Sequence, residues 1–155
     1  VGRCERTAKL VADGFASVGG NFQYDGKLEA LFGMYIHDYE AVCQLSRQHK
    51  GELPGVFLRA WFNGLLPTEV IDDRETAANK LRSVFHQYLS IADPNTLFIF
   101  VSHDWDIMVL RESVLGLRHE DVGWLGFLDG IAMAYSASAR QTHYAWNDVV
   151  RAVVR

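Results

Sequence analysis

Apolar side chains recur at helical spacing along four parts of the chain. In the first, apolar positions follow one another at intervals of four, three and four residues, which marks one face of a helix. Asp38 stands where the second helix needs a cap, and Gly116 follows the fourth as a C-terminal stop. The Asp93-Pro94-Asn95 turn ends the third. The pattern predicts helices over residues 3–16, 38–48, 73–91 and 104–115.

Three apolar segments predict strands instead. Residues 96–102, TLFIFVS, form a continuous β-rich run without alternation, which is typical of a strand buried on both faces of a parallel sheet. Residues 131–136 and 141–146 are expected to form two more strands, joined by a short link. Residues 147–154 are expected to form a short final helix. Helices interleaved with buried strands favour an α/β layered fold.

Residues 51–72 are the least regular part of the chain. Glycines and prolines interrupt a short aromatic stretch, in which Phe57, Trp61 and Leu65 recur at intervals of four. One interpretation is a lid over a binding site, with the aromatic residues lining a substrate pocket. The alternative is a packed surface segment whose aromatic residues belong to the core.

Composition narrows the class of protein. With 155 residues, 49% of them hydrophobic and 22% charged, the chain is long enough for one globular domain, and we expect residues 1–155 to form it. A net charge of -4 argues against a general nucleic-acid binder. No apolar run reaches the roughly 18 residues of a membrane span. The charged start is not a signal peptide, so a cytoplasmic location is expected.

The two cysteines do not make a disulfide scaffold or a zinc motif. Cys4 and Cys43 lie on apolar helix faces, which predicts buried thiols. The six histidines form no paired metal-ligand pattern at helical spacing, so no metal site is expected.

The end of the 96–102 segment is the first candidate site. His103 and Asp104 follow it directly and precede a helix. Ligands of open α/β sheets bind outside the carboxyl ends of the strands, and helix N-termini favour anions. Asp104 is able to exchange a proton there. The alternative is that His103 has only a structural role.

The start of the first helix is the second candidate site. Arg3 and Thr7 are four residues apart and share a helix face. A guanidinium grips phosphate oxygens through two parallel hydrogen bonds, and free N–H groups of the first turn add to it. The alternative is a solvated Arg3 on a charged surface. Arg6 lies off that face and is expected to point to solvent.

Together, R-C-x-x-T-A at the start of a helix and S-H-D at the end of an apolar run resemble the histidine phosphatase superfamily, the phosphoglycerate mutase-like family. The resemblance extends from Arg3 to about Met133. It implies a three-layer α/β/α sandwich with a mostly parallel sheet and a phosphohistidine intermediate. It matches Arg3 and His103 to phosphate-binding residues, and Asp104 to the proton donor of the acid phosphatase branch. Glu29 or Asp38 match the acidic residue of the mutase-like branch, so both remain alternative donors.

One family motif is missing. The family's nucleophile is the histidine of R-H-G at the end of the first strand, and this sequence contains no R-H-G. We therefore expect the first strand and the nucleophile to precede Val1.

The resemblance implies a metal-independent phosphomonoester hydrolase without a cofactor, acting on a small phosphate ester. A phosphoglycerate mutase-type transferase and a catalytically inactive phosphate-binding or regulatory module of the same fold are the alternatives. The resemblance does not choose among them, nor does it name the substrate.

Overall fold

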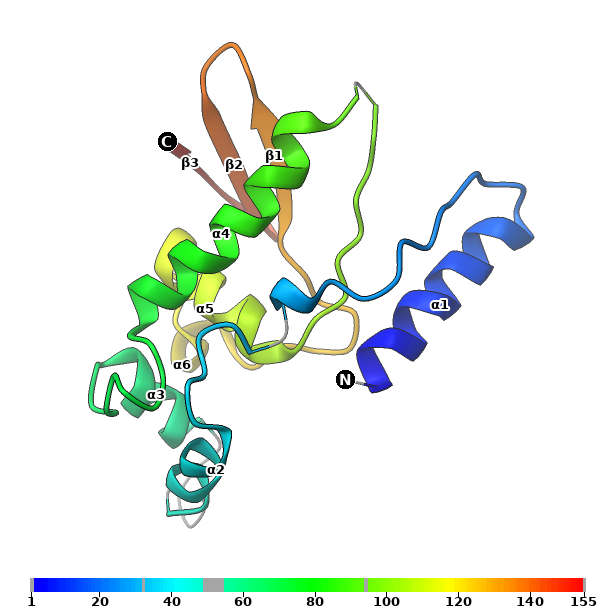
Figure 1. Ribbon diagram of the computed structural model, residues 1–155. Coiled ribbons are helices and arrows are strands. Elements are labelled where there is room, and N and C mark those ends of the chain that lie inside the picture. Colours follow the sequence, from blue (N-terminus) through cyan, green and yellow to red (C-terminus); the bar gives the residue numbers. More distant parts are fainter. Residues whose placement is uncertain (1, 32, 49–54, 94, 155) are drawn as a thin grey trace.

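The computed structural model describes residues 2–31, 33–48, 55–93 and 95–154 (Figure 1). Helices make up most of the regular structure, and the strands follow one another at the C-terminal end of the chain. In order, the elements are α1 (Gly2–Ser17), the 3-10 helix η1 (Glu29–Leu31), α2 (Tyr39–Gln48), α3 (Val56–Phe62), α4 (Arg74–Ile91), α5 (Asp104–Leu115), α6 (His119–Val122), β1 (Ala132–Ser136), β2 (Gln141–Trp146) and β3 (Val149–Val154).

The sheet is antiparallel, with the strand order β1-β2-β3. His143 of β2 lies opposite Ala134 of β1 and Ala152 of β3. Strands that follow one another through short turns pair antiparallel. The turns begin or end at residues with left-handed backbone, Arg140 (φ 51°) and Asn147 (φ 52°). The prediction of a mostly parallel α/β/α sandwich is therefore wrong.

The predicted strand over residues 96–102 does not form in the described part of the chain. The segment is irregular and runs back from the end of α4 to the start of α5 (Figure 1). Phe98 and Phe100 pack their rings on Tyr88 of α4, with ring centroids 5.6 and 5.3 Å away. Leu97, by contrast, is 73% exposed. Because residues 96–102 pair with no strand in the described ranges, they are not the centre of a parallel sheet.

The predicted final helix is also wrong, because its residues form β3. The run Val-Val-Arg-Ala-Val-Val is rich in β-branched side chains, which fit a pleated surface better than a helix. Pairing with all six residues of β2 completes the strand. A third strand also stabilises a hairpin that would be marginal alone.

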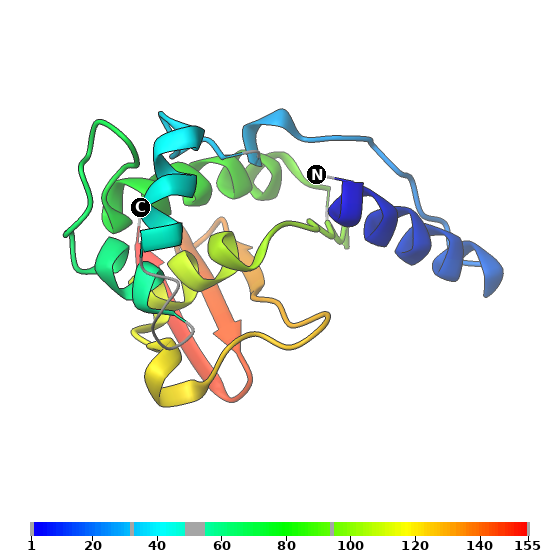
Figure 2. The ribbon, with the colours of Figure 1, turned by 90° about the horizontal axis from the view of Figure 1, so that it is seen from below.

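The core lies where α4 and α5 pack on each other and on the sheet (Figure 2). Leu81 of α4 and Val109 of α5 are fully buried, and Tyr144 of β2 belongs to the same buried cluster. Asp73 caps α4 by accepting hydrogen bonds from two backbone N–H groups of its first turn. Gly116 ends α5 in left-handed backbone (φ 73°). The helix limits therefore follow local capping chemistry.

Helix α1 stands apart from the core, and Figures 1 and 2 both show it projecting to one side. None of its residues is buried. Within the described ranges, no helix has the length and apolarity needed to cross a membrane.

Candidate functional site

His103 is the N-cap residue of α5, with extended backbone (φ -84°, ψ 157°). The residue at this position turns the chain into the helix while the first backbone N–H groups of the helix remain free of helical partners. Those N–H groups carry a partial positive charge. The half-buried imidazole of His103 therefore lies at the N-terminus of α5, as the sequence predicts, but the strand expected to end before it does not form in the described residues.

The start of α1 lies against His103. The Cys4 Sγ atom is 3.9 Å from His103 Nδ1 and 3.8 Å from Nε2. The two residues are 99 positions apart in the chain, so this contact joins both candidate sites. Figures 1 and 2 both show the beginning of α1 beside the segment that leads into α5. Cys4 and Cys43 are half-buried, so the predicted burial of the thiols is incomplete.

Arg3 precedes Cys4 and is exposed, with Thr7 half-buried one turn further along α1. Among the described residues, no hydrogen bond or ion pair joins Arg3 to His103 or Asp104. Arg3 is therefore next in the chain to the contact between Cys4 and His103, with an exposed side chain. Arg6 is also exposed, as predicted.

Asp104 is exposed at the first position of α5. Its Oδ1 accepts a hydrogen bond from the Trp105 backbone N–H at 3.0 Å, and its Oδ2 accepts one from Trp124 Nε1 at 3.3 Å. Trp124 belongs to the irregular segment that follows α6. In the same segment, Asp129 accepts a hydrogen bond from the Gly126 backbone N–H at 2.7 Å. The Asp104 carboxylate is thus oriented yet accessible, which suits a proton donor.

The two alternative donors do not join this site through any contact in the described ranges. Glu29 is exposed in η1. Asp38 caps α2, because its Oδ1 accepts a hydrogen bond from the Ala41 backbone N–H at 2.9 Å. Neither makes a hydrogen bond or ion pair with His103. Of the three predicted donors, only Asp104 adjoins His103.

A buried carboxylate that the sequence pattern did not indicate, Asp106, lies next to the turn that carries His103. Asp106 is only 3% exposed; it accepts a hydrogen bond from Tyr35 Oη at 2.6 Å and another from the Ser102 hydroxyl. Desolvation raises its pKa above the usual range for an aspartate, although both hydrogen bonds oppose the shift. The available signal was its spacing, because Asp106 shares a helix face with Val109 and Leu110.

The acidic cluster of Glu112, His119 and Glu120 has the outward form of a metal site. One ligand atom from each lies within 4.8 Å of the others. The Arg59 guanidinium occupies this cluster, however, and donates hydrogen bonds to both carboxylates. It holds the pKa of Glu120 down to about 2, while burial lowers the pKa of His119. The cluster is therefore an ion-pair network, in which Arg59 already neutralises the carboxylates.

The segment considered as a lid is partly outside the described residues, at 51–54. The described remainder packs into the core, because Phe57 and Trp61 of α3 are 8% and 1% exposed. Trp61 Nε1 donates to the backbone carbonyl of Asp72 at 2.7 Å. Phe57 stacks on Trp105, with ring centroids 5.2 Å apart. These contacts favour the packed-segment interpretation for residues 55–72.

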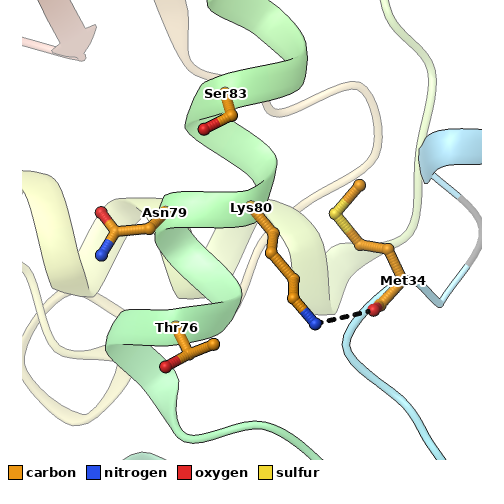
Figure 3. Close-up of a pocket in the computed structure, with 5 residues that line it drawn as sticks. All are labelled: Met34, Thr76, Asn79, Lys80 and Ser83. Atoms are coloured by element: carbon orange, nitrogen blue, oxygen red, sulfur yellow. Dashed lines mark hydrogen bonds between the residues drawn. The ribbon is translucent and has the colours of Figure 1, made fainter.

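A surface hollow of about 540 Å³ lies along α4 (Figure 3). Lys80 crosses it and donates to the Met34 carbonyl at 3.3 Å and to Asp72 Oδ2 at 2.5 Å. Its lining includes none of the predicted site residues; the lining residues are Met34, Thr76, Asn79, Lys80 and Ser83. The Lys80 ammonium already pairs with Asp72, so Lys80 presents no unpaired positive charge to the hollow.

The chain matches no family model, no curated protein and no solved structure.

Proposed function

We propose that the protein is a metal-independent phosphomonoester hydrolase of the histidine phosphatase superfamily, acting on a small phosphate ester through a phosphohistidine. The contact between Cys4 and His103 carries this proposal. It supports a single phosphate site made from the starts of α1 and α5, although the two predicted motifs are far apart in the chain. The support for this proposal is the arrangement of the site residues, and the observed fold adds none.

Each residue has a role in the proposed reaction. Arg3 grips two phosphoryl oxygens, and His103 stabilises the charge that develops on them in the transition state. Asp104 gives its proton to the oxygen of the leaving alcohol as the phosphorus–oxygen bond breaks. The same carboxylate then takes a proton from the water that breaks the phosphorus–nitrogen bond, and inorganic phosphate leaves.

Under this proposal the nucleophile is the histidine of an R-H-G motif, which residues 1–155 do not contain. Its imidazole nitrogen attacks phosphorus and forms the covalent intermediate. The absence of R-H-G also favours a second candidate, a phosphate-binding module without hydrolytic activity. A cytoplasmic location is part of the proposal, and the two free cysteines are compatible with a reducing compartment.

Hydrolysis of 4-nitrophenyl phosphate by the full-length protein tests this function. We expect His103→Ala and Arg3→Ala each to lower kcat/KM by about 100-fold or more. Arg6→Ala is the matched control for Arg3, because Arg6 is an exposed arginine of the same helix. His86→Ala is the control for the loss of an imidazole. Near-normal rates in either site variant would show that the site is elsewhere.

Phosphate binding separates the candidates. A protein that binds phosphate with His103 and Arg3 but releases no 4-nitrophenol is the inactive module. A protein that passes the phosphoryl group to an added alcohol in preference to water is a transferase. Isothermal titration with inorganic phosphate and product analysis with an acceptor alcohol make these distinctions.

A further inference from the structure

The turn that carries His103 rests on a buried carboxylate. Asp106 lies three residues after His103 in α5, and its backbone N–H donates to the His103 carbonyl at 3.2 Å. Its side chain bends back to accept the hydroxyl of Ser102, the residue just before His103. Asp106 therefore bonds to Ser102 through its side chain and to His103 through its backbone.

Tyr35 connects this carboxylate to the other half of the chain. Its hydroxyl donates to Asp106 Oδ1 at 2.6 Å, and Tyr35 itself is 3% exposed. Its ring stacks on Trp61, with centroids 5.1 Å apart, and Trp61 is fixed by its hydrogen bond to the Asp72 carbonyl. The Tyr35 hydroxyl thus comes from a rigid part of the core. A buried carboxylate that turned away would lose both hydrogen bonds and remain desolvated.

We propose that Asp106 is a positioning residue of the phosphate site, which fixes the orientation of His103 and Asp104 through its hydrogen bonds to Ser102 and Tyr35. This inference rests on the proposed function. Asp106 is buried and does not touch the substrate in this arrangement. Its effect falls on the angle at which the turn presents the imidazole and the neighbouring carboxyl group. Small errors in such geometry lower the rate of the chemical step.

The effect should fall on kcat more than on KM. Arg3 grips the phosphate in the ground state, and among the described residues no hydrogen bond joins Arg3 to the Asp106 side chain. The imidazole orientation matters most when charge develops on the phosphoryl oxygens. Loss of an interaction made only in the transition state lowers kcat and kcat/KM equally.

The experiment compares three variants of the full-length protein: Asp106→Asn, Tyr35→Phe and Ser102→Ala. Each removes a charge or one hydroxyl and changes little volume. Ser102→Thr is the conservative variant, because it keeps a hydroxyl. Asp148→Asn is the matched control, since Asp148 is an exposed carboxylate in the turn between β2 and β3. The readouts are the kinetics of 4-nitrophenyl phosphate hydrolysis and the imidazole ¹⁵N signals of His103 by NMR.

We expect Asp106→Asn to lower kcat by about 10- to 100-fold with KM within about twofold of the wild type. Tyr35→Phe and Ser102→Ala should give smaller losses, and Ser102→Thr should recover most of the rate. The His103 signals should move in Asp106→Asn and stay in place in Asp148→Asn. Unchanged kcat with unmoved His103 signals would overturn the inference, and so would a loss that only follows the unfolded fraction.

A failure of the proposed function gives a different result. In that case the wild type hydrolyses no aryl phosphate, and the His103 signals alone decide about Asp106. If they move in Asp106→Asn, Asp106 positions His103 for another purpose. If they do not move, the positioning role is wrong as well.

Discussion

Arg59 joins α3 to α5 and α6 through two carboxylates. Its Nη1 and Nη2 atoms donate to Glu112 Oε1 and Oε2 at 2.6 and 2.7 Å, which is the parallel two-bond geometry of a strong pair. It also donates to both oxygens of Glu120. The side chains of Arg59 and Glu112 are only 17% and 6% exposed. Removal of Arg59 would therefore leave a buried carboxylate with most of its compensation gone.

Arg59→Leu measures that cost. Breaking a buried ion pair by removing one partner costs about 3–5 kcal/mol. Arg74 remains, with its Nη1 atom 2.9 Å from Glu112 Oε1, and its side chain is 30% exposed. Because this second cation compensates part of the charge, we expect the lower end, about 3 kcal/mol. For a chain of this length, that loss corresponds to a fall in Tm of about 6–12 °C.

Urea unfolding at pH 7, followed by far-UV circular dichroism, measures the change in unfolding free energy. Arg74→Leu is the control and should cost about 1 kcal/mol or less, because its pair is partly exposed. The double variant Arg59→Leu/Glu112→Leu should be more stable than Arg59→Leu, since it removes the unpaired charge as well. An Arg59→Leu variant within about 0.5 kcal/mol of the wild type would refute the assigned cost of the buried charge. So would a double variant no more stable than the single one.

Two further predictions concern the same region. The pKa of Glu120 falls from 4.5 to about 2 on folding, so its pairing adds stability above the unfolded pKa of 4.5 and loses it as the pH falls towards 2. Its side chain is 37% exposed, so solvent screening reduces the contribution to about 1 kcal/mol. Urea midpoints of the wild type and Glu120→Gln should therefore differ at pH 6 and converge at pH 2; a constant difference would contradict this. Gly55→Ala should lower Tm by an amount equivalent to about 1–3 kcal/mol, because Gly55 has φ 99° and a Cβ there would lie 2.5 Å from His119 Nε2. Gly14→Ala in α1 is its control and should raise Tm slightly, since nothing lies within 4 Å; equal effects of the two would contradict the strain at Gly55.

The helices were predictable because their limits depend on nearby residues. The expected 73–91 helix is α4, and its cap Asp73 accepts hydrogen bonds from the backbone N–H groups of Glu75 and Thr76 at 3.0 Å. Gly116 stops α5 in left-handed backbone, as expected. The helices over 3–16 and 38–48 are likewise present as α1 and α2. Caps and stops act over a few residues, so the sequence displays them.

The sheet was not predictable in the same way, because a strand depends on its partner. An apolar run such as residues 96–102 fits a buried strand, but here it packs its aromatic residues on α4 and pairs with nothing in the described ranges. Residues 147–154 fit a short helix by length, yet a tight turn at Asn147 returns them to β2. The limits of β1 and β2 were predicted to within one residue. Their order and direction come from the turns.

In the candidate site too, the local features were predictable from the sequence and the long-range contacts were not. His103 and Asp104 were predicted to lie between the end of a buried strand and the start of a helix. The start of the helix is confirmed, whereas the strand does not form in the described residues. The approach of Cys4 to His103 spans 99 residues, so only the resemblance placed the two motifs together. Asp106 was not predicted, because the sequence shows that a charged residue lies on an apolar helix face but not which residues will bond to it. Tyr35, its partner, is 71 residues away.

Helix α5 carries three buried charged residues, Asp106, Arg111 and Glu112. Their contacts connect the packing of the core to the position of the site. Arg111 is 1% exposed; its Nη2 donates to the Gly123 carbonyl at 2.9 Å, and its guanidinium lies 4.8 Å from the centre of the Trp146 ring. Desolvation lowers its pKa, so this placement is costly. Apolar contacts alone tolerate small shifts of a helix, whereas Arg111, Glu112 and Asp106 each require partners at defined positions along it. We infer that these contacts fix both the position of α5 against the core and its rotation about its own axis. The placement of His103 at the start of α5 depends on both.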